Sequence, residues 1–192
     1  MTQPDQLPEF PARTVGNRLF ATTCILRPAG LDDLAFLRQL YHSFRADELA
    51  RVPWPPQDKQ AFLNQQFDLQ HRYYIAAFPQ TDFLIIEKEG VRIGRLYIDL
   101  SADIWHIIDV GLLPEWRNRG IGLEMLNEIK AAAITRESLG IILHVDKANG
   151  RAQKLYQASG FEVIDATETH TRMQWLSRQV LPKTVDGRSG VN

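Results

Sequence analysis

The spacing of apolar residues along the chain predicts a mixture of helices and short strands. Apolar positions that recur every three or four residues are typical of helices, and they occur from residue 31 to a proline-rich break at 52–56, over about 57–77, from about 123 to 136, and over 152–159. Alternating or short apolar runs are typical of strands, and they cover residues 19–27, 83–87, 92–100, 105–113, 140–145, 161–164 and about 170–175. This order of elements predicts one mixed α/β domain.

Both ends of the chain lack this periodicity. Residues 1–18 contain Pro4, Pro8 and Pro11, and we expect them to form an extended or disordered arm. Residues 177–192 are polar and contain glycine, which is typical of a loose tail. The domain is therefore expected to span residues 19–176.

Composition narrows the classes of function. The chain of 192 residues has a formal net charge of −1 with scattered basic residues, which argues against nucleic acid or an anionic membrane as a partner. The single cysteine, Cys24, excludes an internal disulfide, and its apolar surroundings predict a buried structural thiol. No apolar run reaches transmembrane length, the N-terminus lacks the pattern of a signal peptide, and the histidines lack metal-site spacing. A cytoplasmic protein without a bound metal is expected.

The most informative stretch lies at residues 109–126, where an apolar run ends at Pro114 and a glycine turn leads into a helix. The first amides of a helix lack intrahelical partners and attract anions. Gly120 and Gly122 allow close approach to the backbone, and Arg117 and Arg119 add positive charge. The stretch predicts a phosphate or pyrophosphate site; a capped surface helix with glycines kept for packing is the alternative.

Two known phosphate motifs do not fit this turn. The Walker pattern is absent, and the dinucleotide pattern would need glycine where Met125 stands. The string Arg117-x-x-Gly120-x-Gly122 after a strand instead resembles the coenzyme A loop of the GNAT superfamily of N-acetyltransferases. A second motif of that family is matched at Asn149, Ala152, Leu155, Tyr156, Gly160 and Phe161.

The resemblance covers about residues 19–175 and implies the GNAT fold. That fold has a mixed, mostly antiparallel sheet of six or seven strands flanked by about four helices. The resemblance also implies that acetyl-CoA is the donor and that the amine attacks it directly. The implied cofactor-binding residues lie on the strand, the loop and the following motif: Val110, Gly111, Leu112, Arg117, Asn118, Arg119, Gly120, Ile121, Gly122, Asn149 and Tyr156.

Acetyl transfer needs a proton for the departing thiolate and a base for the amine. Tyr156 matches the family's tyrosine that donates to the sulfur; the alternative is a tyrosine that only packs in the helix. For the base, the resemblance makes His144 and Asp109 equal candidates, because members of the family carry a glutamate or aspartate at these strand positions, and His106 is a third candidate. Each could instead be a satisfied polar residue of the sheet, with a water chain acting as the base.

We expect an acetyl-CoA-dependent N-acetyltransferase whose acceptor is a primary amine on a small molecule. A protein N-terminus or lysine is the alternative acceptor. The alternative from another class is an acyl-CoA-binding module without turnover, which acts as a sensor or partner. A homodimer is plausible by family analogy alone.

Overall fold

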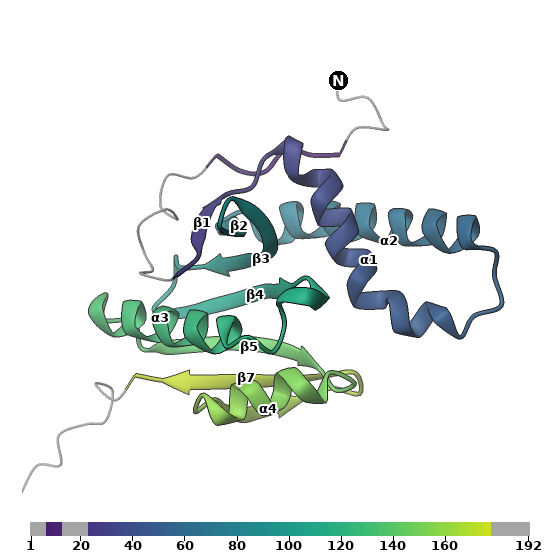
Figure 1. Ribbon diagram of the computed structural model, residues 1–192. Helices are drawn as coiled ribbons and strands as arrows, with labels where there is room; N and C mark the ends of the chain where they lie inside the picture. Colours follow the sequence, from purple (N-terminus) through teal and green to yellow (C-terminus); the bar gives the residue numbers. More distant parts are fainter. Residues whose placement is uncertain (1–6, 13–22, 178–192) are drawn as a thin grey trace, which may run out of the picture.

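The computed structural model describes residues 7–12 and 23–177, and the elements below are those of this part of the chain (Figure 1). The strands are β1 (Ile25–Pro28), β2 (Thr81–Lys88), β3 (Val91–Asp99), β4 (Ile104–Leu112), β5 (Gly140–Asp146), β6 (Glu162–Ala166) and β7 (His170–Leu176). The helices are α1 (Leu34–Ala50), α2 (Pro56–Ala77), α3 (Ile121–Thr135) and α4 (Gly150–Ala158), with the 3₁₀ turns η2 (Leu31–Asp33) and η3 (Pro114–Trp116).

The strands form one sheet in the order β1-β2-β3-β4-β5-β7-β6. Every neighbouring pair is antiparallel except β4 and β5, which are parallel and are joined through α3. A parallel pair needs such a crossover connection. The mixed, mostly antiparallel sheet with four α-helices confirms the predicted fold class.

The helices bury their apolar residues against opposite faces of the sheet. One core contains Leu37 and Leu40 of α1, Phe67 of α2, and residues of β2 and β3. The other core contains Met125 and Ile129 of α3 together with residues of α4 and of the inner strands. In Figure 1, α3 and α4 lie on the same side of the sheet, whereas α1 and α2 form a hairpin that extends beyond the strand ends.

Each predicted helix and strand has a counterpart in the structure, with shifts of one to three residues at most ends and a larger one at the start of the first strand, predicted over residues 19–27. The first strand begins at Ile25, and residues 13–22 lie outside the described part of the chain. The last helix begins at Gly150, two residues earlier than predicted, because the Asn149 side chain accepts a hydrogen bond from the amide of Ala152 and caps the first turn. Pro56 stands at the first turn of α2, where its missing amide hydrogen costs nothing.

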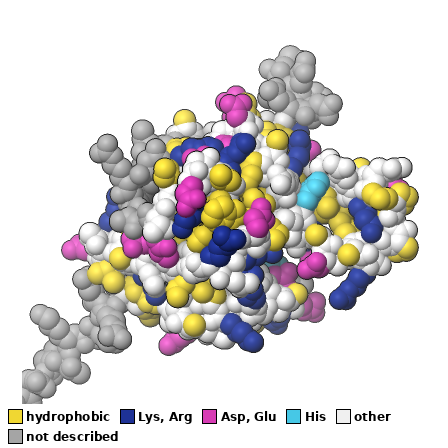
Figure 2. Space-filling model, viewed as in Figure 1, with side chains coloured by type: hydrophobic (Ala, Val, Ile, Leu, Met, Phe, Trp, Pro, Cys, Tyr) yellow, Lys and Arg dark blue, Asp and Glu magenta, His cyan; other side chains and the backbone are white. Residues whose placement is uncertain are grey.

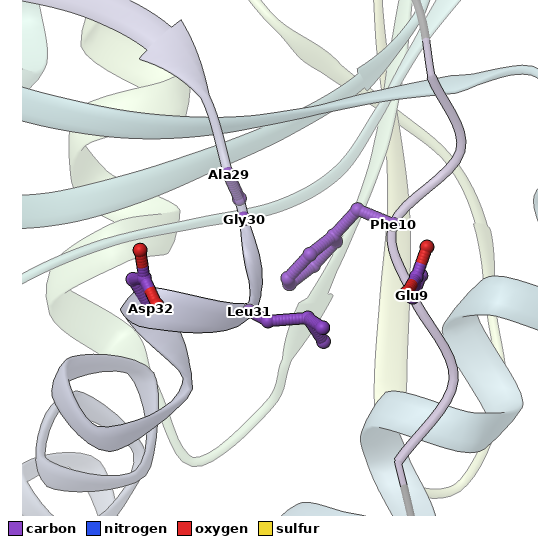
Figure 3. A pocket seen from close by; sticks show the side chains of 6 residues that line it. All are labelled: Glu9, Phe10, Ala29, Gly30, Leu31 and Asp32. Atoms are coloured by element: carbon purple, nitrogen blue, oxygen red, sulfur yellow. The ribbon is translucent and has the colours of Figure 1, made fainter.

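Residues 7–12 of the expected arm pack against the domain. Leu7 is buried, the carbonyl oxygen of Pro8 lies 2.7 Å from His71 Nε2, and the Phe10 ring contacts those of His71 and Phe83. Phe10 and Leu31 face each other across a cavity of about 260 Å³ between this segment and the turn after β1 (Figure 3). Cys24 is buried, as predicted.

A buried carboxylate fixes the connection from β1 to α1. Asp33 Oδ2 accepts a hydrogen bond from Arg27 Nη1 at 2.7 Å, and its other oxygen accepts from Arg27 and Arg92. The backbone amide of Gly30 donates to the same carboxylate. Burial raises the pKa of Asp33, but the hydrogen bonds from Arg27 and Gly30 outweigh that effect and hold the pKa below its ordinary value.

We predict that Asp33→Asn lowers the free energy of unfolding by about 2 kcal/mol at pH 7, because two guanidinium groups lose their shared partner. The folded-state pKa of Asp33 is depressed, so its contribution is present above the ordinary carboxyl pKa and is lost as the pH falls below it. Urea unfolding measures the free energy of unfolding of wild type and variant at pH 7 and pH 3. The difference between the two proteins should be smaller at pH 3 than at pH 7. An equal difference at both pH values would contradict the prediction.

Candidate functional site

The parallel strands β4 and β5 separate part of the way along their length. Register pairs join Ile104 to Gly140 and end with Ile107 and Leu143, whereas β4 continues to Leu112 and β5 to Asp146. We call the gap between residues 108–112 and 144–146 the β4–β5 opening. Within the described residues, β4 is paired here only with β3, so its other edge can accept hydrogen bonds from an extended ligand.

A bulge marks the point at which β4 leaves β5. Tyr97 is opposite Asp109, but the next residue of β3, Ile98, is opposite Ile107, so Ile108 is the extra residue. Such bulges bend a strand and redirect its side chains. The bulge therefore sets the direction in which the edge of β4 enters the opening.

Gly111 of β4 lies directly against α1. A Cβ atom at Gly111 would lie 2.3 Å from the Phe44 ring, so any larger residue would displace that ring or the strand. Phe44 is itself contacted by the guanidinium groups of Arg95 and Arg117. Glycine at position 111 thus allows α1 to pack directly on the strand beside the opening.

The two candidate bases His106 and His144 lie in contact with each other. His106 Nε2 is 3.3 Å from His144 Nδ1, and the pair spans β4 and β5 where their pairing ends. Burial, together with the neighbouring His144, lowers the pKa of His106 to about 4. Burial, together with Arg172 and His170, also lowers the pKa of His144. The pair is therefore neutral at pH 7 and able to accept a proton.

Asp109, the other candidate base, is bound to two side chains. Its Oδ2 atom accepts hydrogen bonds from Arg95 Nη2 at 2.7 Å and from the Tyr74 hydroxyl at 2.9 Å. Its Oδ1 atom accepts a longer bond from Arg95 Nε at 3.3 Å. A carboxylate with both oxygens occupied in this way is well suited to an anchoring role.

Tyr156 lies on α4 and is buried in the core that contains α3. Burial raises the pKa of its hydroxyl to about 12, and the charge of Asp109 contributes to the rise. Among the residues that the structure describes, no hydrogen-bond partner of this hydroxyl is found. Tyr156 is therefore a protonated phenol with a free donor, as a general acid requires.

The loop before α3 has the backbone of an anion site. Gly120 has φ +80° and accepts the first bond of the helix, from the amide of Glu124. No atom lies within 4 Å of a Cβ built on Gly120, so the space beside it is open. The amides of the first turn, including Ile121 and Gly122, have no partner inside the helix and face this end.

The two loop arginines differ in their contacts. Arg117 Nε donates to the carbonyl oxygen of Leu112 at 2.8 Å, which ties the loop back to the end of β4. The Arg119 guanidinium lies 5.2 Å from the centre of the Trp116 ring. Arg117 thus holds the shape of the loop, whereas Arg119 remains near the surface beside the first turn of α3.

Sequence reasoning missed two residues of this site, Arg95 and Tyr74. Arg95 is 2% exposed and is the largest fully buried side chain among the described residues. One signal was available, because Arg95 is a lone charge within the apolar run of β3, as Asp109 is within that of β4. Nothing in the amphipathic pattern of α2 distinguishes Tyr74 from its neighbours.

Figure 2 shows basic and acidic side chains interspersed over the viewed face, without a field of one sign. Within residues 7–12 and 23–177, there is no group of three or more side chains able to hold a metal ion. No helix of this described part is long and apolar enough to cross a membrane.

Comparisons with solved structures show the same fold at low sequence identity. PaiA N-acetyltransferase from Thermoplasma acidophilum, in complex with coenzyme A, has 17% identity and a TM-score of 0.62 over 80% of this chain and 99% of its own. A spermidine N-acetyltransferase from Vibrio cholerae, in complex with coenzyme A and spermine, has 18% identity and a TM-score of 0.53 over 80% and 95%. RimL, a ribosomal L7/L12 alpha-N-protein acetyltransferase, has 12% identity and a TM-score of 0.59 over 92% and 98%.

No curated protein matches the sequence. A model of the acetyltransferase (GNAT) family matches residues 37–161, a span that contains the β4–β5 opening, the loop before α3 and Tyr156. This match covers more than half of the chain. The chain therefore belongs to the acetyltransferase (GNAT) family and is an acyltransferase.

Proposed function

We propose that this enzyme moves the acetyl group of acetyl-CoA directly to a primary amine on a small molecule. The observation that carries the proposal is the β4–β5 opening. A protonated, unpartnered Tyr156 lies on one side of the sheet there, and a neutral histidine pair lies at the point where the two strands separate. In the proposal, the base serves the nitrogen of the forming nitrogen–carbon bond, and the acid serves the sulfur of the breaking carbon–sulfur bond.

Acetyl-CoA is the acetyl donor, and the residues present fit it. In the proposal, the edge of β4 at Val110, Gly111 and Leu112 pairs with the pantetheine arm as an added strand would. The open end of α3 receives the pyrophosphate through the amides at residues 120–122, with Asn118 and Arg119 beside them. Arg117 supports this loop through Leu112, and Asn149 holds the start of α4. The coenzyme A bound to PaiA and to the spermidine acetyltransferase supports this assignment.

The chemistry assigned to the residues has three parts. His144, with His106 behind it, takes a proton from the amine as its nitrogen bonds to the thioester carbonyl carbon. Tyr156 gives its proton to the sulfur as the carbon–sulfur bond breaks. Asp109, held by Arg95 and Tyr74, keeps a negative charge near Tyr156, and this charge helps to retain the phenol proton until the thiolate forms.

A small-molecule acceptor is favoured by the depth of these groups. Tyr156 is buried, and the Asp109 side chain is 16% exposed. The base His144 is exposed, but the amine must also reach the thioester carbon bonded to the sulfur that Tyr156 protonates, and an amine on a slender chain can enter to that depth more easily than an amine on a folded surface. A protein N-terminus or lysine remains the alternative acceptor, and the fold serves both kinds, as the spermidine enzyme and RimL illustrate.

We predict that Gly120→Asp weakens acetyl-CoA binding about tenfold or more, because a negative charge is placed beside the pyrophosphate. The matched control is Gly120→Asn, which has nearly the same shape and tolerates a positive φ equally well. Calorimetry should show tight acetyl-CoA binding by wild type and by Gly120→Asn, and weak binding by Gly120→Asp. Equal affinities of the two variants would place the pyrophosphate elsewhere.

We predict that Tyr156→Phe lowers kcat about a hundredfold or more, with KM for acetyl-CoA nearly unchanged, because only the proton donor is lost. Thiol release in the presence of a panel of primary amines measures both constants. An unchanged kcat would leave Tyr156 with a packing role alone. Coenzyme A binding by wild type without transfer to any amine would favour a sensor module.

We predict that kcat at saturating amine falls along an acid limb whose midpoint lies below pH 6.5, the ordinary histidine pKa, because protonation of the histidine pair removes the base. The pKa values of His106 and His144 are lowered, so both are neutral above this range. His144→Gln should lower kcat about a hundredfold and change the acid limb, whereas Asp109→Asn should keep that limb. If both variants keep the wild-type pH–rate profile, neither residue is the base.

A further inference from the structure

The buried charges behind the β4–β5 opening form one connected network. Arg95 of β3 donates through Nη2 to Asp109 of β4 at 2.7 Å and to Gln70 Oε1 of α2 at 3.1 Å. Its guanidinium also lies over the Tyr97 ring, at 5.0 Å from the ring centre. A buried guanidinium is costly unless it is paired and hydrogen-bonded, so this arrangement fixes the Asp109 carboxylate firmly.

Tyr74 extends the network to a second point on α2. Its hydroxyl donates to the Asp109 oxygen that Arg95 Nη2 also contacts, at 2.9 Å. Burial and the charge of Asp109 raise the pKa of Tyr74 above its ordinary value, so the hydroxyl stays protonated and remains a donor. Its ring packs edge-on against Phe78 and Tyr97, which holds the side chain in place independently of the hydroxyl.

The network is attached to the backbone of β4 next to its bulge. Asp109 directly follows Ile108, the bulged residue at which β4 leaves β5. A side chain that is fixed at both carboxylate oxygens restricts the backbone that carries it. The hydrogen bonds to Asp109 therefore limit how far the bulge can move and how widely the opening can spread.

We propose that Tyr74 is a positioning residue for acetyl transfer: through Asp109, its hydroxyl holds the β4 bulge in the geometry that aligns the thioester with the base and the acid. This inference rests on the proposed function. It assigns a role to α2, a helix that contributes no residue to the two family motifs. A small displacement of reacting groups lowers a rate far more than it lowers binding, so the effect should appear in kcat.

The test compares Tyr74→Phe with Tyr73→Phe. The first change removes the hydroxyl that contacts Asp109 and keeps the packed ring. The second removes the hydroxyl of the adjacent residue on the same helix, whose side chain is 61% exposed. Both substitutions are then repeated in an Asp109→Asn background, which removes the negative charge to which the Tyr74 hydroxyl donates. Steady-state kinetics and thermal unfolding are measured for the whole set.

The proposal expects Tyr74→Phe to lower kcat about tenfold while KM for acetyl-CoA changes less than about twofold. Tyr73→Phe should leave both constants unchanged, and the thermal midpoints of the two variants should agree within about 2 °C. In the Asp109→Asn background, Tyr74→Phe should cause a clearly smaller loss than in wild type, because the neutral amide oxygen is a weaker acceptor than the carboxylate.

Three results would overturn the proposal. One is an unchanged kcat for Tyr74→Phe. Another is a full additional loss in the Asp109→Asn background, since Tyr74 would then act independently of Asp109. The third is a thermal midpoint for Tyr74→Phe more than about 5 °C below that of Tyr73→Phe, which would assign the hydroxyl to general stability.

A separate measurement distinguishes failure of the inference from failure of the proposed function. If wild type transfers acetyl to no amine, the proposed function fails. Amide hydrogen exchange over residues 106–112, in the presence of coenzyme A, then tests the network alone. Faster exchange in Tyr74→Phe than in Tyr73→Phe supports the positioning role, and equal exchange overturns it.

Discussion

The early end of the pairing between β4 and β5 is the constraint on which the rest of the site depends. In a sheet, the backbone amide and carbonyl groups of adjacent strands normally form hydrogen bonds with each other. Here β4 keeps its bonds to β3 as far as Leu112 but loses its other neighbour after Ile107. The free edge is extended, fixed from one side and open on the other. A donor with a long amide-containing arm can complete it without any change of fold.

The charged groups around the opening differ in how they are stabilised. Asp109 and Arg95 form a largely buried ion pair, and hydrogen bonds with Gln70 and Tyr74 complete the set. No carboxylate among residues 7–12 and 23–177 forms a hydrogen bond with the histidine pair, and burial shifts both rings toward the neutral form. Two kinds of environment lie a few residues apart on one strand. This difference is the ground on which we propose Asp109 as the anchor and the histidine pair as the base.

The sequence was sufficient for most of the fold and for the identity of the main candidate residues. Periodicity located the helices and strands, because an amphipathic helix and a half-buried strand each have a fixed repeat. The sequence could not show that Arg117 contacts Leu112 rather than a ligand, since an arginine can hold a loop or bind a phosphate. Nor could it separate His144 from Asp109 as the base. The contacts on which we base that proposal are made by Arg95 and Tyr74, which lie 14 and 35 residues away from Asp109 along the chain.

The contact between Gly111 and Phe44 has a consequence for how this enzyme can vary. The ring of Phe44 occupies the space that a side chain at position 111 would need, so the two positions share one volume. A related chain with alanine at position 111 should carry a smaller residue at position 44, and one with an aromatic residue at 44 should keep glycine at 111. The helix that borders the opening and the strand that forms its edge are thus expected to change together over evolutionary time.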